Sequence, residues 1–290
     1  MSIEPANPAD PEASRARLFV LAAALLWSLA GVFIKSLDVH PLSIVFYRSL
    51  FAALFFAPLA PRKSWTLSLP LLFSALSYTA AISAFVSANK LTTAANAIVL
   101  QYTAPIFVFV FARVWFREAV SRLNLVALAA GTLGVAVIFA GSAGQPDFHG
   151  VALAVLSGLF FAIYMTSLRF VKEIDPRYLT LANNLVCSAA LLPWAGSELV
   201  LTGRETVSLM VMGVVQLGIP YFLFSRGLEK ISLQEASLLV LIEPVLNPIW
   251  VALVHGEVPA RATLWGGGLI LSGLGVRYAL PALRRRAPAE

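Results

Sequence analysis

The sequence predicts an all-α polytopic membrane protein, and three observations support this fold class. First, 59% of the 290 residues are apolar and only 12% are charged, whereas soluble domains carry about a quarter charged residues. Second, the charges leave uncharged runs close to or above the roughly 17 to 25 residues that cross a hydrocarbon core. These runs cover 18–34, 64–89, 91–112, 123–146, 178–197 and 206–225. Third, the two halves of the chain repeat one residue pattern, described below.

Stretches bounded by Arg, Lys, Pro or Gly predict the helices in chain order. Little chain remains outside them: a polar N-terminal tail at 1–17, a short basic tail at 282–290, and loops too small for a soluble catalytic domain. Ten transmembrane helices are predicted at about 18–37, 42–60, 67–88, 93–112, 123–141, 150–170, 178–195, 207–226, 235–254 and 262–281.

The first predicted helix also has features of a cleaved signal peptide. It follows two arginines and contains the small-residue stretch Ser28-Leu29-Ala30, which is similar to a signal-peptidase site. We expect this helix to be retained, because it is the first member of a repeated pair.

The distribution of Lys and Arg predicts the orientation. Sixteen of the 21 basic residues fall on the side that holds the N-terminus, whereas the other side holds Lys35, Lys90, Arg204 and Arg261, and Arg48 lies inside a span. Because positive loops stay in the cytoplasm, we expect an inner-membrane protein with both termini cytoplasmic. The net charge of +6 therefore reflects topology and does not indicate nucleic-acid binding.

An internal repeat relates 18–141 to 150–281. Pro41 and Pro58 match Pro176 and Pro193 with the same spacing of seventeen. Each half holds five spans, an odd number, so the two halves should lie in the membrane with opposite orientation. Inverted repeats are typical of secondary transporters, which bind substrate at mid-membrane between the halves. A constant offset of 139 pairs Ala97 with Ala236, Pro105 with Pro244, Glu118 with Glu257, Arg122 with Arg261, and Gly134 with Gly273.

The pattern Pro105…Glu118…Arg122, repeated as Pro244…Glu257…Arg261, resembles the two EamA repeats of the drug/metabolite transporter superfamily over about 18–281. Within that superfamily the chain looks closest to the YddG-type amino-acid exporters. The resemblance implies ten helices and outward movement of aromatic and other neutral amino acids and related amphipathic metabolites. The Glu and Arg of the pattern fall in loops, so they imply loop packing and not a substrate site.

Several polar and aromatic residues fall near the predicted bilayer centre, where lipid-facing positions should be aliphatic. Unpaired polar groups in hydrocarbon cost roughly 1–3 kcal/mol or more, so these side chains should face the bundle interior. They either line a cavity for an amphipathic solute or hold helices together by hydrogen bonds. The candidate substrate-binding residues are Trp27, Tyr78, Asn96, Gln101, Tyr102, Tyr164, Gln216, Tyr221 and Glu243.

Two charged residues inside spans have alternative interpretations. Glu243 is the only carboxylate well inside a span, and burial favours a neutral form that exchanges a proton or meets a substrate ammonium group. Its alternative role is a protonated structural residue. Arg48 lies about two turns into the second span, where it either reaches the interface or pairs with a loop acid, or binds a substrate carboxylate.

Prolines and small residues inside spans predict bends and close helix contacts. Pro105, Pro220 and Pro244 each remove a backbone hydrogen bond, so they either gate an alternating-access cycle or shape the bundle. Ala130 with Gly134, and 266–268 with Ser272, suit close helix packing. These runs face either a helix of the same chain or a second subunit, so the sequence leaves monomer and homodimer open.

Motifs of other protein classes are absent from the sequence. There is no P-loop stretch, no paired histidine spacing and no G-x-S-x-G, so we expect a protein that is not an enzyme, with no cofactor and no metal. Export of lipophilic cations or drugs by the same fold is an alternative to amino-acid export. An intramembrane lipid-processing enzyme and a non-transporting scaffold are more remote alternatives. Substrate range, direction and coupling ion are not readable.

Overall fold

The computed structural model describes residues 11–62, 65–117, 122–145, 147–195, 201–231 and 233–286, and in these ranges the regular structure is helical. The first half contains α1 (Pro11–Ser28), α2 (Ala30–Ser36), α3 (Pro41–Phe56), α4 (Leu69–Leu91), α5 (Ala94–Gln101), α6 (Ala104–Val114) and α7 (Arg122–Ser142). The second half contains α8 (Phe148–Ser167), η2 (Leu168–Phe170), α9 (Pro176–Ala195), α10 (Gly203–Val211), η4 (Met212–Gly218), α11 (Ile219–Leu228), α12 (Leu233–Val240), α13 (Glu243–His255) and α14 (Arg261–Arg286).

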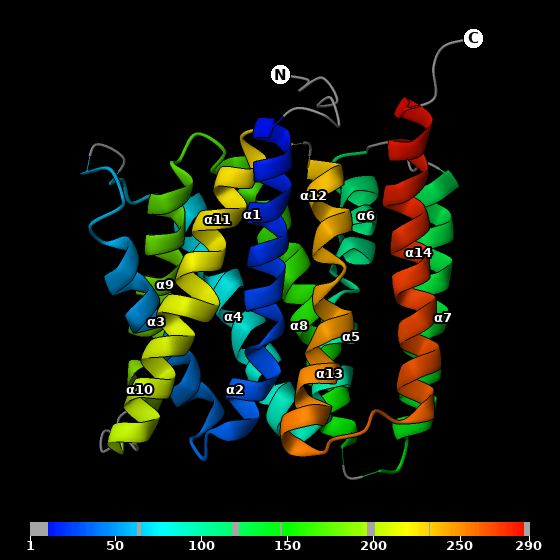
Figure 1. Ribbon diagram of the computed structural model, residues 1–290, viewed down its shortest axis with the longest axis horizontal. Coiled ribbons are helices and arrows are strands. Elements are labelled where there is room, and N and C mark those ends of the chain that lie inside the picture. The colour runs from blue at the N-terminus through cyan, green and yellow to red at the C-terminus, as the bar shows by residue number, and fades with distance from the viewer. Residues whose placement is uncertain are drawn as a thin grey trace.

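The helices form one upright bundle in which α1 begins and α14 ends at the same end (Figure 1). The shorter apolar helix α3, and α9 and α14, lie alongside the others in the same bundle. In the described part of the chain, seven stretches are long and apolar enough to cross a membrane: Pro11–Ser36, Leu69–Leu91, Ala94–Val114, Arg122–Ser142, Phe148–Phe170, Gly203–Leu228 and Glu235–His255.

The two ends of the chain differ from the sequence prediction. Helix α1 begins at Pro11, so the predicted N-terminal tail at 1–17 is helical from that residue onward. Its early start is explained by Ala13, Ala16 and Val20, which are buried against α11 and α12. Helix α14 continues to Arg286, past the predicted boundary at 281. Apolar content located the spans, but at the N-terminal end packing against other helices extended α1 beyond its apolar core.

Four predicted spans are interrupted in the structure. Leu29 separates α1 from α2, and Tyr102 and Thr103 separate α5 from α6. Residues 241 and 242 separate α12 from α13, and a π-helical segment, η4, joins α10 to α11. The breaks after α5 and α12 share the repeat offset of 139, and each precedes a proline in the first turn of the next helix. Pro105 and Pro244 have no N–H for the carbonyl four residues earlier, which explains why both helices break there.

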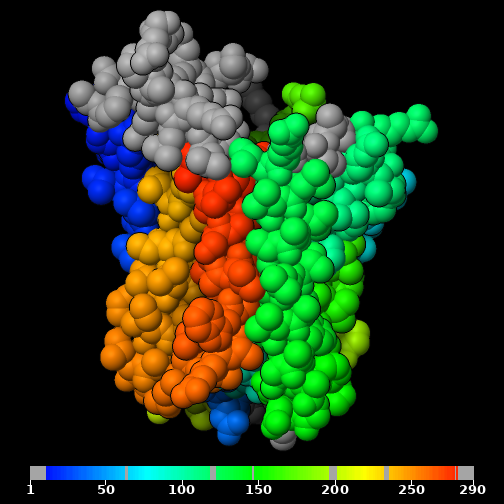
Figure 2. All heavy atoms as spheres, turned by 90° about the vertical axis from the view of Figure 1, so that its right-hand side faces the viewer, coloured from blue at the N-terminus to red at the C-terminus, as the bar shows by residue number. Residues whose placement is uncertain are grey.

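The small residues of α7 and α14 pack against each other within one chain. Figure 2 shows the two helices side by side, and a Cβ placed on Gly134 would lie 2.5 Å from the carbonyl oxygen of Gly266. The reverse contact is equally close, and Gly273 lies against Ala130 in the same way. These stripes therefore serve contact between the last helices of the two halves, a question that the sequence had left open.

Polar contacts at the two bundle ends tie the halves together. At the end opposite the termini, Lys35 forms a 2.8 Å ion pair with Glu257, whose other carboxylate oxygen accepts a hydrogen bond from the Ala94 N–H at the start of α5. At the end with the termini, Arg17 pairs with Glu235 at 2.7 Å. Glu257 therefore packs loops together, as the resemblance implied. Its repeat counterpart, Glu118, lies outside the described residues.

Candidate functional site

A buried arginine occupies the middle of α3. Arg48 is 2% exposed, so its side chain is enclosed by the surrounding helices. Among the described residues it forms no ion pair with a carboxylate, and its Nε has no hydrogen-bond partner. Its charge interacts electrostatically with Tyr78, Cys187 and Tyr221. A buried cation without a counter-ion is costly.

Two tyrosines from different halves meet beside this arginine. The ring centroids of Tyr78 on α4 and Tyr164 on α8 are 5.4 Å apart, and Asn183 Nδ2 on α9 donates to the Tyr164 hydroxyl at 2.9 Å. The Tyr78 hydroxyl and Asn183 Oδ1 are buried without a partner in the structure. We call Arg48, Tyr78, Tyr164, Asn183 and Tyr221 the arginine–tyrosine cluster. Its unpaired polar atoms are available to a bound solute.

An aromatic group extends the cluster toward α1. The rings of Trp27 and Tyr221 meet edge to face at 5.1 Å, and Phe224 lies 5.3 Å from Trp27. Gln216 Nε2 donates to the Trp27 carbonyl oxygen at 3.3 Å, while Gln216 Oε1 is buried without a partner. Aromatic faces beside one open amide acceptor suit an apolar side chain with a polar end.

The π-helical segment η4 brings Gln216 to this position. Gly213 within it packs so closely on α3 that a Cβ would lie 2.6 Å from the Arg48 carbonyl oxygen. Pro220, in the first turn of α11, has no N–H to donate to the Gln216 carbonyl. The missing hydrogen bond is consistent with the π-helical pattern of η4, which directly precedes α11. π-helical turns often occur at functional sites, and here one lies directly against Arg48.

Tyr102 and Glu243 join the two helix breaks of the repeat. The Tyr102 hydroxyl lies 2.8 Å from Glu243 Oε2 and 3.2 Å from the Val240 carbonyl oxygen. Glu243 also interacts electrostatically with Tyr221, which connects this pair to the arginine–tyrosine cluster. Pro105 and Pro244 therefore lie where the two breaks contact each other, one from each half.

Two candidates are engaged in contacts between helices. Asn96 lies at the start of α5, where its side-chain oxygen accepts from Thr263 at 2.6 Å and its amide donates to Thr92 at 2.9 Å. Gln101 Nε2 donates to Ser157 Oγ at 2.8 Å, and that hydroxyl donates to the carbonyl of Ala81. Neither amide joins the arginine–tyrosine cluster. Depth estimated from span midpoints could not show that these groups already have partners.

The structure adds residues that sequence reasoning did not select. Asn183 joins the cluster directly, and Ser49 on α3 donates to the Cys187 sulfur at 3.4 Å. Asn247 Nδ2 donates to the Ser28 carbonyl at 3.0 Å, beside the break between α1 and α2. The available signal was an amide inside an apolar run, as in Asn183 within 178–197. In the described ranges, no group of three or more His, Cys, Asp or Glu residues could hold a metal ion.

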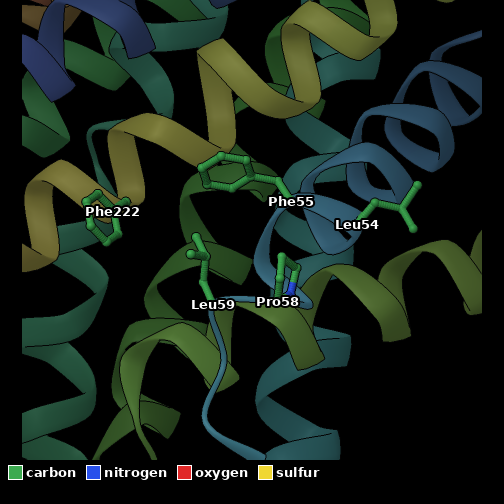
Figure 3. Close-up of a pocket in the computed structure, with 5 residues that line it drawn as sticks. All are labelled: Leu54, Phe55, Pro58, Leu59 and Phe222. Carbon is green, nitrogen blue, oxygen red and sulfur yellow. The ribbon is translucent and has the colours of Figure 1, made fainter.

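A separate apolar pocket of about 400 Å³ lies between α3 and α11. Figure 3 shows its lining, which consists of Leu54, Phe55, Pro58, Leu59 and Phe222. Phe55 follows Arg48 by two helical turns on α3, and Phe222 follows Tyr221 directly. Its lining contains no residue of the arginine–tyrosine cluster and no polar side chain.

Comparison with known proteins decides the family. The model of the EamA-like transporter family matches residues 14–140 and again 148–278. The chain belongs to this family. Both parts of the site straddle the two matches, since Arg48, Tyr78 and Tyr102 come from the first and Tyr164, Asn183, Tyr221 and Glu243 come from the second.

Relatives support a membrane transporter of this family. An uncharacterized transporter of Archaeoglobus fulgidus is 30% identical over 88% of this chain and 93% of its own length. The uncharacterized transporter YwfM of Bacillus subtilis is 26% identical over 94% and 96%. A solved protein crystal structure superposes with a TM-score of 0.67 at 18% identity, covering 94% of this chain and 99% of the other, which shows the fold alone. The chain is a multi-pass membrane transporter of the EamA family.

Proposed function

We propose that this EamA protein is a secondary transporter that exports amino acids, aromatic and other neutral ones, and related amphipathic metabolites across the inner membrane. The observation that carries the proposal is the buried guanidinium of Arg48, which has no carboxylate partner among the described residues. A substrate carboxylate would supply the missing counter-ion through two parallel hydrogen bonds. Its binding would convert an unfavourable buried charge into a paired one.

The remaining groups suit the other parts of an amino acid. Glu243 would receive the ammonium group, and Tyr221 is near enough to both Arg48 and Glu243 to interact electrostatically with each. The rings of Trp27, Tyr78 and Tyr221 would contact the apolar side chain. In this arrangement a zwitterion bridges two halves of the protein, and closing around it exposes the site to alternate sides of the membrane.

The proposal includes ten membrane spans in two inverted five-helix repeats, with both termini cytoplasmic. Two family matches of nearly equal length, and helix breaks that share one offset, support the repeat. The excess of Lys and Arg on the side of the termini supports the orientation. Alternating access by the two halves would need no further domain.

Export of lipophilic cations is a second candidate. The aromatic group around Trp27 and the carboxyl of Glu243 favour it, because rings and a carboxylate both attract a cation. Arg48 opposes it, since a second buried cation in the cluster would be repelled. The two candidates therefore predict opposite responses to removal of the arginine.

Counterflow in proteoliposomes tests the proposal. Vesicles loaded with unlabelled L-phenylalanine should accumulate labelled L-phenylalanine from outside, whereas empty liposomes should not. Phenethylamine, which lacks the carboxylate, and 3-phenylpropionate, which lacks the ammonium, should each compete weakly, because each leaves one buried charge unpaired. Strong competition by phenethylamine alone, without phenylalanine counterflow, would support the cation exporter.

Variants connect the assay to Arg48. Arg48→Lys keeps the charge but loses bidentate geometry, so the KM for phenylalanine should rise about tenfold or more. Arg204→Lys, an exposed residue of the α10 first turn, is the matched control and should behave as wild type. L-Phenylalanine should also slow maleimide labelling of Cys187, the only cysteine of the chain, because this buried thiol reacts when the protein opens and bound ligand stabilises the folded state. Intact counterflow with lysine at position 48 would contradict the proposed role.

A further inference from the structure

The short helix α3 leaves a hollow at the end of the bundle that holds the termini. With 16 residues, Pro41–Phe56, it is about 24 Å long at 1.5 Å per residue, whereas a hydrocarbon core is about 30 Å thick. It packs against α10 and η4, while α11 continues to Leu228 at that end. The apolar pocket of about 400 Å³ lies where α3 ends beside the flank of α11.

The lining of this pocket suits hydrocarbon. Figure 3 shows Phe222 on α11 across from Leu59 and Phe55. Leu54 is 61% exposed and Pro58 is also exposed, so part of the lining lies on the outer surface of the bundle, where the lipid would be. No lining residue has a polar side chain. Since water gains no hydrogen bonds in an apolar hollow, the occupant that a bilayer supplies is a lipid acyl chain.

A positive charge lies at the edge of the same pocket. Arg226 follows Phe222 by one helical turn, and its guanidinium carbon is 5.7 Å from the centroid of the Phe222 ring. A second exposed arginine, Arg62, comes three residues after Leu59. The pocket therefore combines an apolar lining with cationic groups on the side of the termini, which matches the two parts of an anionic lipid.

One acid competes for this charge. Arg226 Nη1 lies 3.3 Å from Glu229 Oε1, and the side chains of both residues are 55% exposed. An ion pair so open to solvent contributes little to stability. A phosphate accepts two parallel hydrogen bonds from a guanidinium, so it can replace Glu229 as the partner of Arg226.

We propose that the pocket between the end of α3 and α11 binds one anionic phospholipid from the leaflet on the side of the termini. One acyl chain would lie along Phe55, Leu59 and Phe222, and the phosphate would bind Arg226. The chain moves from one apolar environment to another, so the headgroup supplies the selectivity. Each basic residue near a membrane surface strengthens binding of anionic lipid about fivefold, and Arg62 would add to the effect of Arg226.

The bound chain would also support the π-helical segment η4. A Cβ on Gly218 of η4 would lie 2.8 Å from Cδ1 of Phe55, so the Phe55 ring packs directly on this segment. An empty pocket deprives the ring of dispersion contacts on its other side. Lipid occupancy should therefore raise the unfolding temperature of the protein.

Native mass spectrometry tests the site without any transport measurement. Full-length protein, delipidated in a neutral detergent, is titrated with dioleoyl phosphatidylglycerol or with dioleoyl phosphatidylcholine, which have identical chains. The first phosphatidylglycerol molecule should bind at about tenfold or more lower concentration than phosphatidylcholine, since both arginines favour the anionic headgroup. This preference should shrink as the salt concentration rises.

Four variants assign the binding to the proposed groups. Arg226→Gln should weaken phosphatidylglycerol binding about fivefold and leave phosphatidylcholine unchanged. Glu229→Gln removes the competing carboxylate, so it should strengthen phosphatidylglycerol binding. Leu59→Trp fills the pocket and should weaken both lipids. Arg113→Gln is the matched control, because Arg113 is an exposed arginine in the last turn of α6, as Arg226 is in the last turn of α11.

The outcomes decide the proposal in both directions. A phosphatidylglycerol preference that falls in Arg226→Gln, rises in Glu229→Gln and is unchanged in Arg113→Gln supports the site. Equal affinity for the two lipids, an equal loss in Arg113→Gln and Arg226→Gln, or binding unaffected by Leu59→Trp overturns it. A failure of Leu59→Trp to fold leaves the two variants of exposed residues, Arg226→Gln and Glu229→Gln, to decide. The transport function stands or falls separately, because this assay measures lipid binding alone.

Discussion

Replacing Arg48 by methionine should make the protein more stable and abolish amino-acid transport. The guanidinium is 2% exposed and has no ion-pair partner among the described residues, so without substrate the fold carries an uncompensated charge. Methionine occupies most of the same volume with a flexible apolar chain. The wild-type residue would then be retained for binding at the expense of stability, as functional residues often are.

The magnitude follows from the position of the charge. An arginine at the centre of a membrane helix costs about 3 kcal/mol, so its removal should stabilise the fold by about that amount. The cavity that the smaller methionine leaves should reduce this gain by roughly 1 kcal/mol. The net gain of about 2 kcal/mol corresponds to a rise of roughly 4–8 °C in unfolding temperature. L-Phenylalanine at ten times its Kd should stabilise the wild type by about 1.4 kcal/mol, and the methionine variant should show no such shift.

The chain contains its own reporter for this measurement. Cys187 is the only cysteine and is fully buried, so a fluorogenic maleimide reacts with it as the protein unfolds on heating. Arg204→Met, an exposed residue, is the control and should change stability by no more than about 0.5 kcal/mol. A methionine variant at position 48 that is less stable than wild type and still exchanges phenylalanine would refute the reasoning, because Arg48 would then be structural.

Two further predictions concern packing and pH. Gly134→Leu should destabilise the protein by about 1–3 kcal/mol, because its Cβ would lie 2.5 Å from the Gly266 carbonyl oxygen. The control Gly268→Ala, whose Cβ meets nothing within 4 Å, should unfold at the wild-type temperature. Equal unfolding temperatures for the two variants would contradict the close packing of α7 on α14. The Arg177 guanidinium holds the pKa of Asp175 below its ordinary value, so this pair stabilises the fold above about pH 4 and loses its effect as pH falls through the lowered value. Asp175→Asn should therefore lower the unfolding temperature slightly at pH 7, by less than about 1 kcal/mol in stability, and the difference should vanish in acid; a difference that grows in acid would reverse the sign.

The fold could be predicted to a large extent from the sequence because a membrane span is encoded by the local run of apolar residues and its flanking charges. The predicted helix at 123–141 corresponds to α7, Arg122–Ser142, and the one at 178–195 to α9, Pro176–Ala195. Apolar length and bounding charges suffice for such helices. The start of α1 at Pro11 was not predictable in this way, since it depends on burial of alanines against distant helices.

The candidate site was predictable only in part. A polar residue inside an apolar run shows that a partner is required, which pointed to Arg48, Gln216 and Glu243. The run does not show which partner, so Asn96 entered the list although its amide is already bonded to Thr92 and Thr263. Asn183 was missed for the same reason, because its contact with the Tyr164 hydroxyl crosses between α8 and α9.

The sequence by itself determined the helical class, the approximate spans, the repeat and the family resemblance, because hydrophobic length, charge and residue spacing are properties of the chain. Only the tertiary structure decided that Tyr102 meets both Glu243 and the carbonyl that Pro244 leaves without its N–H. It also decided that Arg48 lies beside Tyr78 of its own half and Tyr221 of the other half, with no ion-pair partner among the described residues. The physical reason is that pairing of polar groups in a bundle depends on which helix faces are in contact. Contact between faces is a property of the packed bundle that no single span contains.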